Sequence, residues 1–178
     1  MKIDSRYANM TLWLTGRPCA GKTTLGEHLR RELIQRGYRV VNLDGDVVRG
    51  RLNADLGFSE NDRKENLRRV SHIAQLFNEN GNFVIATFIT PTNDLRAMVR
   101  ANIREFKLCY VRCSLQVCEK RDVKGMYQKA KKGQIQDFTG ISAPFEDPHP
   151  CDISVDTEHL GVEDCTQHIL KVLFYHAS

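Results

Sequence analysis

Eight residues near the N-terminus have the types and spacing of a phosphate-binding loop. Residues 16–23 read Gly-Arg-Pro-Cys-Ala-Gly-Lys-Thr and fit the pattern G-x-x-x-x-G-K-[ST]. Glycines let the backbone wrap closely around an anion, so that successive N–H groups and the positive end of a helix dipole face the phosphates. Lys22 is then expected near the β- and γ-phosphates, and the hydroxyl of Thr23 on Mg²⁺. We therefore predict a nucleotide site formed by Gly16, Arg17, Pro18, Cys19, Ala20, Gly21, Lys22, Thr23 and Thr24.

A second set of chemistry-bearing residues is the acidic pair in Asp44-Gly45-Asp46. It follows residues 39–43, which read as a short strand, and ligands of an open α/β sheet bind outside the carboxyl ends of its strands. The pair is therefore expected to face the same crevice as the phosphate-binding loop. One carboxylate can hold a metal-bound water while the other accepts a proton from an attacking hydroxyl. The same three residues also fit an ordinary turn, and their place after a strand is what favours function.

Basic residues gather in three separate stretches, 49–51, 63–69 and 124–132. No row of aromatic residues alternates with them, and no signature of a nucleic-acid-binding module is present. Near a phosphate-binding loop, such clusters favour a small polyanionic substrate over a nucleic acid. Arg63 and Asn66 lie three positions apart at the start of a predicted helix, so they share one face and can reach the crevice together.

Residues 122–140 are rich in Lys, Gly and Gln and show little apolar periodicity. A basic segment at this point of the chain is typical of a lid that closes over phosphates and excludes water. A disordered surface loop has a similar composition and is the competing interpretation.

Alternating strands and helices are expected to position these residues. Residues 11–15, before the loop, form a short apolar run typical of a buried strand, and a helical pattern follows to about Gln35, before Gly37. Further strands are expected at 39–43, 83–89, 107–112 and 152–155, and further helices at about 59–80, 94–103, 115–121 and from 162 onward. This order predicts one three-layer α/β/α domain of the P-loop NTPase fold, spanning residues 1–178, with a five-stranded parallel sheet.

Composition sets the outer limits. The 178 residues are 41% hydrophobic and 27% charged, with a formal net charge of +4, and no apolar run approaches the roughly 20 residues of a membrane span. Residues 1–6 are charged but not followed by an apolar core, so we expect no secretory signal and a cytoplasmic protein with no membrane partner.

The six cysteines form no Cys-x-x-Cys pair, which favours buried reduced thiols over a zinc site or disulfide bonds. Among them, Cys19 in the phosphate-binding loop is expected to be accessible.

The type of nucleotide enzyme can be narrowed from the motifs present. A guanine-nucleotide switch protein needs an Asn-Lys-x-Asp base-reading motif, and the sequence contains none. Small size, a basic lid segment and the acidic pair after the second strand together indicate a nucleotide-dependent kinase of a small molecule.

Six short motifs then resemble, in order, those of the adenylylsulfate (APS) kinase family. They are residues 43–49 (LDGDVVR), 56–59 (LGFS), 62–66 (DRKEN), 88–91 (FITP), 121–127 (RDVKGMY) and 138–141 (FTGI). The resemblance runs from about residue 10 to 175. It implies transfer of the γ-phosphoryl group of MgATP to the 3′-hydroxyl of adenosine 5′-phosphosulfate (APS), which yields 3′-phosphoadenylyl sulfate (PAPS) in sulfate assimilation. It also implies a homodimer.

The resemblance further implies roles for individual residues. Asp46 becomes the catalytic base, with Lys22 as the second catalytic residue and Asp44 near the Mg²⁺ water shell beside Thr23. Arg121 and Thr157 are placed near the ATP base. The arginines are expected on the phosphosulfate, Phe58 and Phe138 on the two faces of adenine, and Asn66 on the sugar-phosphate side. The full set expected to bind APS is Asp46, Arg49, Phe58, Arg63, Asn66, Ile89, Thr90, Lys124, Phe138 and Thr139.

The sequence departs from the family pattern in three places. The loop reads Arg-Pro-Cys-Ala where the family usually has Leu-Ser-Gly-Ala, so Pro18 and Cys19 are expected to stiffen it. Thr90 stands in place of the usual Ser, and residues 143–150 match only loosely. Two alternatives therefore stay open: a related kinase for another nucleotide-linked anion, such as a cytidine diphosphate conjugate, and a nucleotide-binding regulatory domain without turnover.

Overall fold

Five short strands pair in parallel to form one sheet with the order β2-β3-β1-β4-β5 in the computed structural model, which describes residues 8–175. The strands are β1 (Thr11–Thr15), β2 (Val40–Asp44), β3 (Phe83–Thr87), β4 (Phe106–Arg112) and β5 (Ile153–Asp156). β1 lies at the centre, where Leu12 pairs with Ile85 on one side and Lys107 on the other. All five residues of β1 are buried, because helices cover both faces of a parallel sheet. The N-terminal residues considered above for a secretory signal lie outside the described range.

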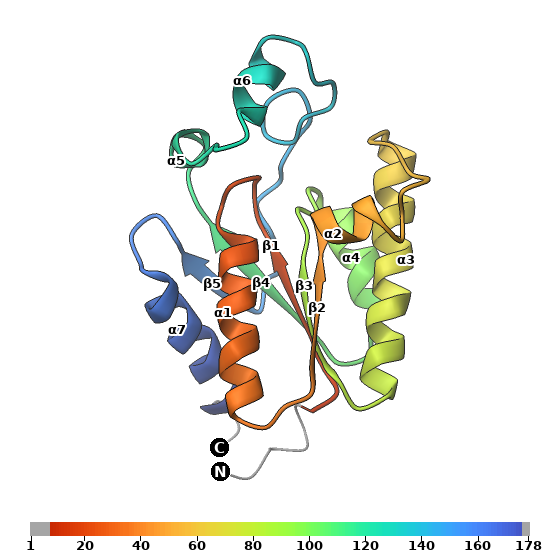
Figure 1. The fold of residues 1–178 in the computed structure, drawn as a ribbon, viewed down its shortest axis with the longest axis vertical. Helices are drawn as coiled ribbons and strands as arrows, with labels where there is room; N and C mark the ends of the chain where they lie inside the picture. Colours follow the sequence, from red (N-terminus) through yellow and green to blue (C-terminus); the bar gives the residue numbers. More distant parts are fainter. Residues whose placement is uncertain (1–7, 176–178) are drawn as a thin grey trace.

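Helices form a layer on each side of the sheet (Figure 1). α1 (Lys22–Gln35) and α7 (Val162–Tyr175) cover one face, and α3 (Glu60–Glu79) and α4 (Asn93–Ala101) cover the other. On the first face Leu29 and Ile169 belong to one apolar cluster, and on the second Val70 packs in another cluster with Trp13. Two apolar layers with the sheet between them confirm the predicted three-layer α/β/α fold.

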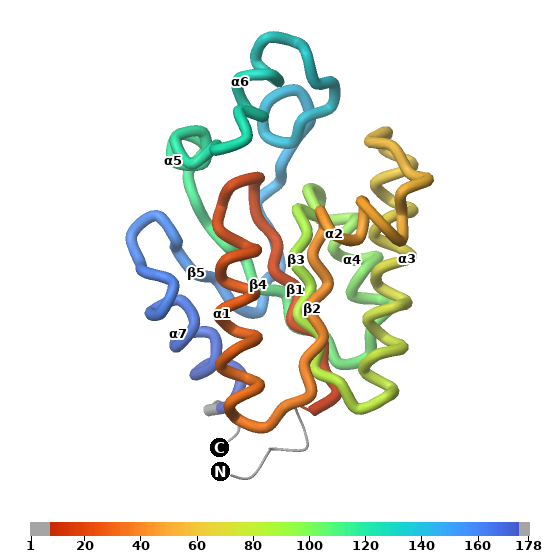
Figure 2. Tube along the Cα trace, in the orientation of Figure 1, coloured from red at the N-terminus to blue at the C-terminus, as the bar shows by residue number. Residues whose placement is uncertain are grey.

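The strand order places a crevice at the carboxyl ends of the strands. The chain forms β2 and β3 on one side of β1 and then crosses to β4 and β5 on the other. Such a reversal leaves a gap above the central strands in which ligands of doubly wound sheets bind. In Figure 2 the loop after β1, the start of α2 (Gly45–Gly50) and the segment that contains α5 (Leu115–Lys120) and α6 (Met126–Lys131) all lie at this end of the sheet.

Several local predictions differ from the structure. β3 ends at Thr87, two residues before the predicted end at 89. Asp44 belongs to β2, and the residues after it form the short helix α2 instead of a turn. The helix begins there because the Asp44 side chain accepts hydrogen bonds from the backbone N–H groups of Asp46 and Val47, at 3.0 and 3.4 Å, as an N-cap does.

The segment 122–140 is packed against the domain, which a free surface loop would not be. Tyr127 is almost fully buried, and its ring meets Phe138 edge-on with centroids 4.9 Å apart. The Tyr127 hydroxyl donates to the carbonyl of Pro18 at 2.9 Å, so α6 is tied to the phosphate-binding loop. Among the helices of residues 8–175, none is long and apolar enough to cross a membrane.

Candidate active site

The loop between β1 and α1 has the backbone geometry of an anion cradle. Gly21 has a positive φ of 92°, and a Cβ on Gly16 would lie 2.5 Å from the carbonyl oxygen of Val111, so both positions require glycine. α1 begins at Lys22, and its N-terminus therefore follows the loop directly. The Lys22 Nζ donates to the carbonyls of Gly16 and Arg17 at 2.9 and 2.7 Å. Burial lowers the pKa of Lys22 to about 8, and an anion beside it would raise that pKa again.

The Arg-Pro-Cys-Ala stretch of the loop has two unusual features. Cys19 adopts a left-handed backbone conformation with φ 61°, which an L-residue adopts at a cost of about 1–2 kcal/mol. Pro18 offers no N–H, and its carbonyl is held by Tyr127. Stiffening of the loop by Pro18 and Cys19 stays a prediction. Cys19 is partly exposed, as expected, and burial together with the nearby Asp122 raises the pKa of its thiol.

The other cysteines are free thiols and are mostly buried. Cys109, Cys113, Cys118 and Cys165 are buried, whereas Cys151 is exposed. The prediction of buried reduced thiols therefore holds for the other four cysteines and is wrong for Cys151, which lies two residues before β5.

Asp44 joins three elements at the centre of the crevice. Its Oδ2 accepts hydrogen bonds from the hydroxyls of Thr23 on α1 and Thr87 on β3, both at 2.8 Å. Burial raises the pKa of Asp44, but the hydrogen bonds from Thr87, Thr23 and two backbone N–H groups outweigh it and hold the pKa below its ordinary value. Asp44 is therefore ionised at neutral pH. A threonine hydroxyl beside a carboxylate suits Mg²⁺, which takes few protein oxygens and keeps phosphate oxygens and waters as its other ligands.

Asp46 lies in the first turn of α2 and meets a residue from the segment 122–140. The Lys124 Nζ is 3.0 Å from Asp46 Oδ2, although 78 positions separate the two in sequence. The Asp46 side chain is 84% exposed and the Lys124 side chain 72%, so solvent screens this ion pair and it adds little to stability. The hydrogen bond that Lys124 donates to Asp46 raises the pKa of Lys124. The structure thus brings together the predicted base and one predicted substrate-binding lysine.

Two arginines and an exposed aromatic ring form the opposite part of the crevice. The Arg49 guanidinium lies over the Phe58 ring at 4.6 Å from its centroid, and Phe58 is 65% exposed. Arg63 donates to the carbonyls of Phe58 and Asp137 and to the hydroxyl of Thr139. Burial lowers the pKa of both guanidinium groups, and their mutual repulsion lowers that of Arg49 further. Two partly buried cations that repel each other are suited to bind an anion between them.

The remaining predicted acceptor residues are buried, except for Ile89, which is half-buried. Phe138 packs against Tyr127 whereas Phe58 stacks with Arg49, so the two rings expected to enclose adenine each have a different partner. Arg63 nevertheless links their segments through its bonds to Phe58 and Thr139. Asn66 is only 3% exposed.

Ile89 and Thr90 follow β3 and are fixed by hydrogen bonds to β1. Thr15 donates to the carbonyl of Ile89 at 2.5 Å, and the indole N–H of Trp13 donates to the Thr90 hydroxyl at 2.9 Å. Thr90 has a left-handed φ of 44°. These contacts hold the backbone at 89–90 rigidly at the edge of the crevice.

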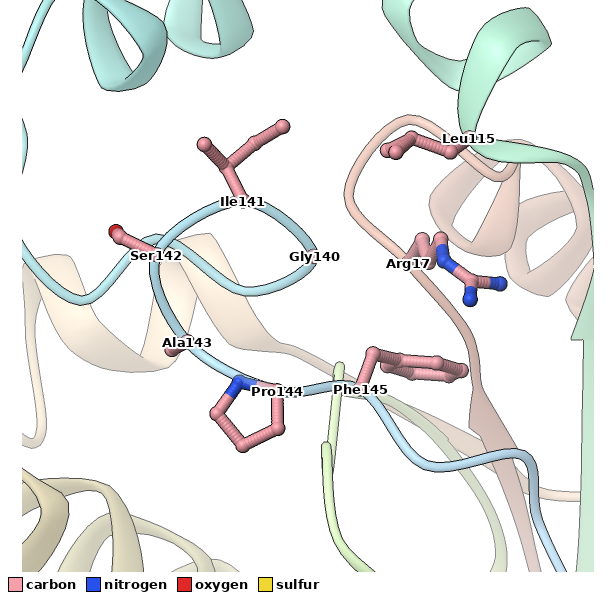
Figure 3. A pocket seen from close by; sticks show the side chains of 8 residues that line it. All are labelled: Arg17, Leu115, Gly140, Ile141, Ser142, Ala143, Pro144 and Phe145. Atoms are coloured by element: carbon pink, nitrogen blue, oxygen red, sulfur yellow. The ribbon is translucent and has the colours of Figure 1, made fainter.

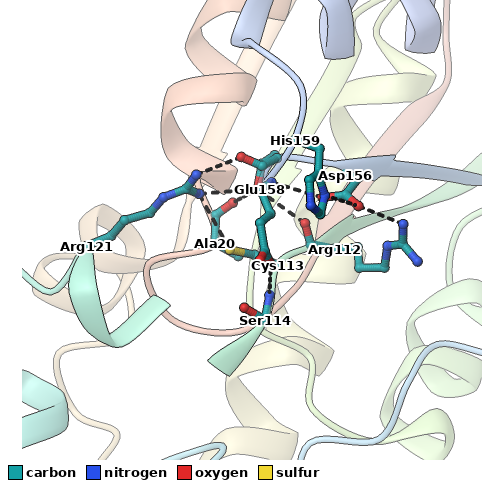
Figure 4. Close-up of polar contacts among 9 residues, drawn as sticks. Ala20, Arg112, Cys113, Ser114, Arg121, Asp156, Glu158 and His159 are labelled. Carbon is teal, nitrogen blue, oxygen red and sulfur yellow. Dashed lines mark hydrogen bonds and ion pairs between the residues drawn. The ribbon is translucent and has the colours of Figure 1, made fainter. Parts of the chain in front are cut away.

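Arg121 and Thr157 are hydrogen-bonded to each other close to Ala20 of the phosphate-binding loop. Figure 4 shows Arg121 and Ala20 in this region. The Arg121 Nη2 donates to the Thr157 carbonyl at 2.7 Å, and the Thr157 hydroxyl donates to the carbonyl of Ala20 at 2.8 Å. The pair predicted near the ATP base therefore does contact the phosphate-binding loop. Glu158, for which the sequence suggested no role, accepts from the backbone N–H of Ser114, the N-cap of α5.

A cavity of about 370 Å³ lies between the phosphate-binding loop and the segment after residue 139 (Figure 3). It is lined by Arg17, Leu115 and residues 140–145. The Arg17 guanidinium stacks over the Phe145 ring at 4.7 Å, so its side chain extends toward this segment. Position 17, one of the departures from the family pattern, thus connects the loop to the region that matches the family loosely.

Sequence reasoning missed three residues of the site. No role was assigned to Tyr127, Thr87 or Asn53, yet Tyr127 holds the loop, Thr87 holds Asp44, and Asn53 holds Asn66 through a 2.9 Å hydrogen bond. Thr87 carried a usable signal, because it is the one polar residue within the apolar run 83–89. Asn53 lies in an irregular stretch and carried none.

The elements of this site indicate the class of protein. A strand, a phosphate-binding loop and a helix, with a carboxylate from another strand beside the loop threonine, are the parts of a P-loop kinase. The profile described as adenylylsulphate kinase matches residues 8–156. The chain therefore belongs to the adenylylsulphate kinase family and is an ATP-dependent kinase, as its motifs predicted.

Individual relatives agree with this assignment. The chain is 44% identical over 168 residues to an adenylyl-sulfate kinase of Bacillus velezensis, covering 93% of this chain and 85% of the relative. The structure of the Mycobacterium tuberculosis APS kinase CysC in complex with AMPPNP and APS is similar with a TM-score of 0.89 and 37% identity, covering 93% of this chain and 98% of that one. A hexameric APS kinase from Thiobacillus denitrificans is similar with a TM-score of 0.73 and 28% identity, covering 97% of this chain and 30% of that one.

Proposed function

We propose that this kinase transfers the γ-phosphoryl group of MgATP to the 3′-hydroxyl of APS and releases ADP and PAPS. The observation that carries the proposal is the placement of Asp44 and Asp46 at the end of β2. Asp44 is bonded to Thr23 of the nucleotide loop, and Asp46, two residues later, points to solvent beside Lys124. A carboxylate proposed to act on the nucleotide side, Asp44, and one proposed to act on the acceptor, Asp46, are therefore adjacent.

The proposed chemistry assigns one task to each group. The nine residues of the loop, 16–24, hold the triphosphate, and Lys22 neutralises charge on the transferred phosphoryl group. Bound Mg²⁺, held by Thr23 and through water by Asp44, would supply further charge neutralisation. Asp46 accepts the proton of the attacking hydroxyl, and an ordinary carboxylate suffices because a loose transition state needs that proton removed late. Arg121 and Thr157 lie beside the ATP base.

The acceptor is proposed to bind between α2, the start of α3 and the segment 122–140. Arg49 and Arg63 hold the phosphosulfate, whose negative charge attracts both guanidinium groups and offsets the repulsion between them. Phe58 offers an exposed ring for adenine, and Phe138 is proposed for its second face. Asn66, Ile89, Thr90, Lys124 and Thr139 complete the pocket.

The segment 122–140 is proposed to act as the lid of this pocket. This segment forms hydrogen bonds with both the nucleotide side and the acceptor side of the crevice. Tyr127 donates to the phosphate-binding loop and Lys124 donates to Asp46. Asp137 and Thr139 accept hydrogen bonds from Arg63. A lid that is tied to both sides excludes water from the transferred phosphoryl group.

The test is a coupled assay of ADP release with MgATP and either APS or a cytidine diphosphate conjugate as acceptor. Turnover with APS and identification of PAPS as the product support the proposal. Preference for the cytidine conjugate would indicate the related kinase instead. Tight ATP binding without turnover of either acceptor would indicate a regulatory nucleotide-binding domain, which the intact Lys22, Thr23 and Asp46 argue against.

We further propose that the protein works as a homodimer in the cytoplasm. The family resemblance supports a dimer, whereas the similar protein of Thiobacillus denitrificans is hexameric. Light scattering of the purified protein distinguishes a dimer from a monomer or a hexamer.

A further inference from the structure

The loop between α2 and α3 contains a fully buried asparagine, Asn53. Among residues 8–175, its side chain forms a hydrogen bond only with the predicted acceptor residue Asn66. The Asn53 Nδ2 donates to Asn66 Oδ1 at 2.9 Å. Asn53 is 0% exposed, and its own Oδ1 has no hydrogen-bond partner in the described part of the chain. A buried amide oxygen without a partner is costly, and two apolar side chains of similar shape would avoid that cost. The amide pair is therefore poorly explained by stability alone.

The backbone of Asn53 fixes the position of this side chain relative to α2. Its N–H donates to the carbonyl of Val48 at 3.0 Å, and its carbonyl accepts from the N–H of Leu56 at 3.1 Å. α2 also carries Asp46 and Arg49. The contact between Asn53 and Asn66 thus connects the helix of the proposed base to α3, the helix of Arg63.

The direction of the hydrogen bond decides what Asn66 can offer to a substrate. An asparagine side chain has one carbonyl oxygen and one NH₂ group, and the oxygen of Asn66 is occupied by Asn53. The NH₂ group remains, and Arg63 lies one turn earlier on the same face of α3. With the amide reversed, Asn66 would present its carbonyl oxygen to the acceptor, which would repel the oxygens of an anion.

We propose that Asn53 is a positioning residue for the acceptor site: its NH₂ group holds the Asn66 carbonyl, so that Asn66 presents only a hydrogen-bond donor to the oxygens of the bound anion. This proposal rests on the proposed function, because it takes Asn66 to be a substrate contact. It assigns no substrate contact to Asn53 itself.

The variant Asn53→Asp tests the direction of the bond. Aspartate has nearly the same shape as asparagine but only accepts when ionised, so Asn66 must reverse its amide to bond with it. We expect the KM for APS to rise at least tenfold while the KM for MgATP stays within twofold of wild type. The matched control is Asn78→Asp, because Asn78 is also buried on α3 and accepts from the Thr11 hydroxyl at 2.7 Å, a bond that aspartate keeps. This control is expected to lower the melting temperature and leave both KM values within twofold.

A double-mutant cycle with Asn53→Ala and Asn66→Ala tests whether Asn53 acts through Asn66, and it remains available if Asn53→Asp does not fold. Asn53→Ala is expected to raise the KM for APS severalfold in the wild type but by less than twofold when Asn66 is already alanine. Equal effects in both backgrounds, or an unchanged KM for APS in Asn53→Asp, would overturn the proposal. Turnover of APS by the wild-type protein is measured first, and its absence would contradict the proposed function. Normal wild-type turnover together with an unchanged KM for APS in Asn53→Asp would contradict only the positioning role of Asn53.

Discussion

The nucleotide side and the acceptor side of the crevice are built in different ways. On the nucleotide side Lys22 is 9% exposed. Thr157 is hydrogen-bonded to Ala20, and Asp44 is hydrogen-bonded to Thr23 and Thr87. On the acceptor side Asp46, Lys124 and Phe58 are largely exposed and come from three separate segments. The nucleotide-side residues thus lie in a network of hydrogen bonds, whereas these three acceptor-side residues are largely exposed to solvent, and Lys124 and Asp46 meet only because the fold brings their segments together.

The difference indicates where substitutions will act. Changes at exposed acceptor residues should reduce turnover or acceptor affinity without loss of stability or of ATP binding. Changes in the nucleotide loop should act on ATP affinity and on the stability of the domain together. The following four predictions test this separation.

Asp46→Ala is expected to have the largest effect. It removes the proposed general base, which predicts a fall in kcat of about 10²- to 10⁴-fold. ATP binding, measured by calorimetry, and the melting temperature should stay near wild type, because Asp46 is exposed and its ion pair with Lys124 adds little. A kcat within a few-fold of wild type would remove the assignment of Asp46 as the base.

Arg63→Ala is expected to weaken the acceptor site specifically. Loss of a partly buried charged donor predicts an increase in the KM for APS of about ten- to hundredfold, with little change in the KM for MgATP. Arg68→Ala is the matched control, since Arg68 lies on the same helix and pairs with Glu65 on the surface. If the two variants have the same KM for APS, Arg63 does not bind the acceptor.

The pH dependence of ATP affinity tests the nucleotide side. Because burial lowers the pKa of Lys22 to about 8, the free enzyme carries the charge below that pH and loses it as the pH rises through it. The KM for MgATP should therefore be constant near pH 7 and rise above about pH 8, by up to about tenfold per pH unit. In Lys22→Arg the side chain stays protonated, so the same rise in that variant would exclude Lys22 as its cause.

Cys19→Gly is expected to have the smallest effect. Glycine relieves the left-handed conformation at φ 61° but adds freedom to the unfolded chain, so the free energy of unfolding should increase by only about 0.5 kcal/mol. Cys151→Gly, at an exposed position that lacks a positive φ, should instead lower it by a similar amount. Chemical denaturation of both variants measures the difference, and equal changes of the same sign would argue against strain at Cys19.

Local patterns were enough to predict much of this protein. The loop and its flanking elements were predicted because their residues are contiguous, and the alternation of strands and helices predicted the sheet and both helical layers. α2 was missed because Asp44-Gly45-Asp46 reads as a turn, and only the structure shows that Asp44 caps a helix. The packing of 122–140 was missed because Tyr127, Ala130 and Phe138 are too widely spaced within a basic stretch to produce an apolar period.

The amino-acid sequence by itself determined the nucleotide loop, the succession of strands and helices along the chain, and the family. These depend on residues that are neighbours in the chain or on motifs in a fixed order. The tertiary structure alone decided which distant side chains meet. Lys124 reaches Asp46 and Arg63 reaches Thr139 because parallel strands deliver their following loops to one edge of the sheet. Asn53 and Asn66 both lie between β2 and β3, and they meet through the packing of the loop after α2 against α3. Hydrogen bonds across such distances are set by the packing of the layers, and no local spacing of residues encodes them.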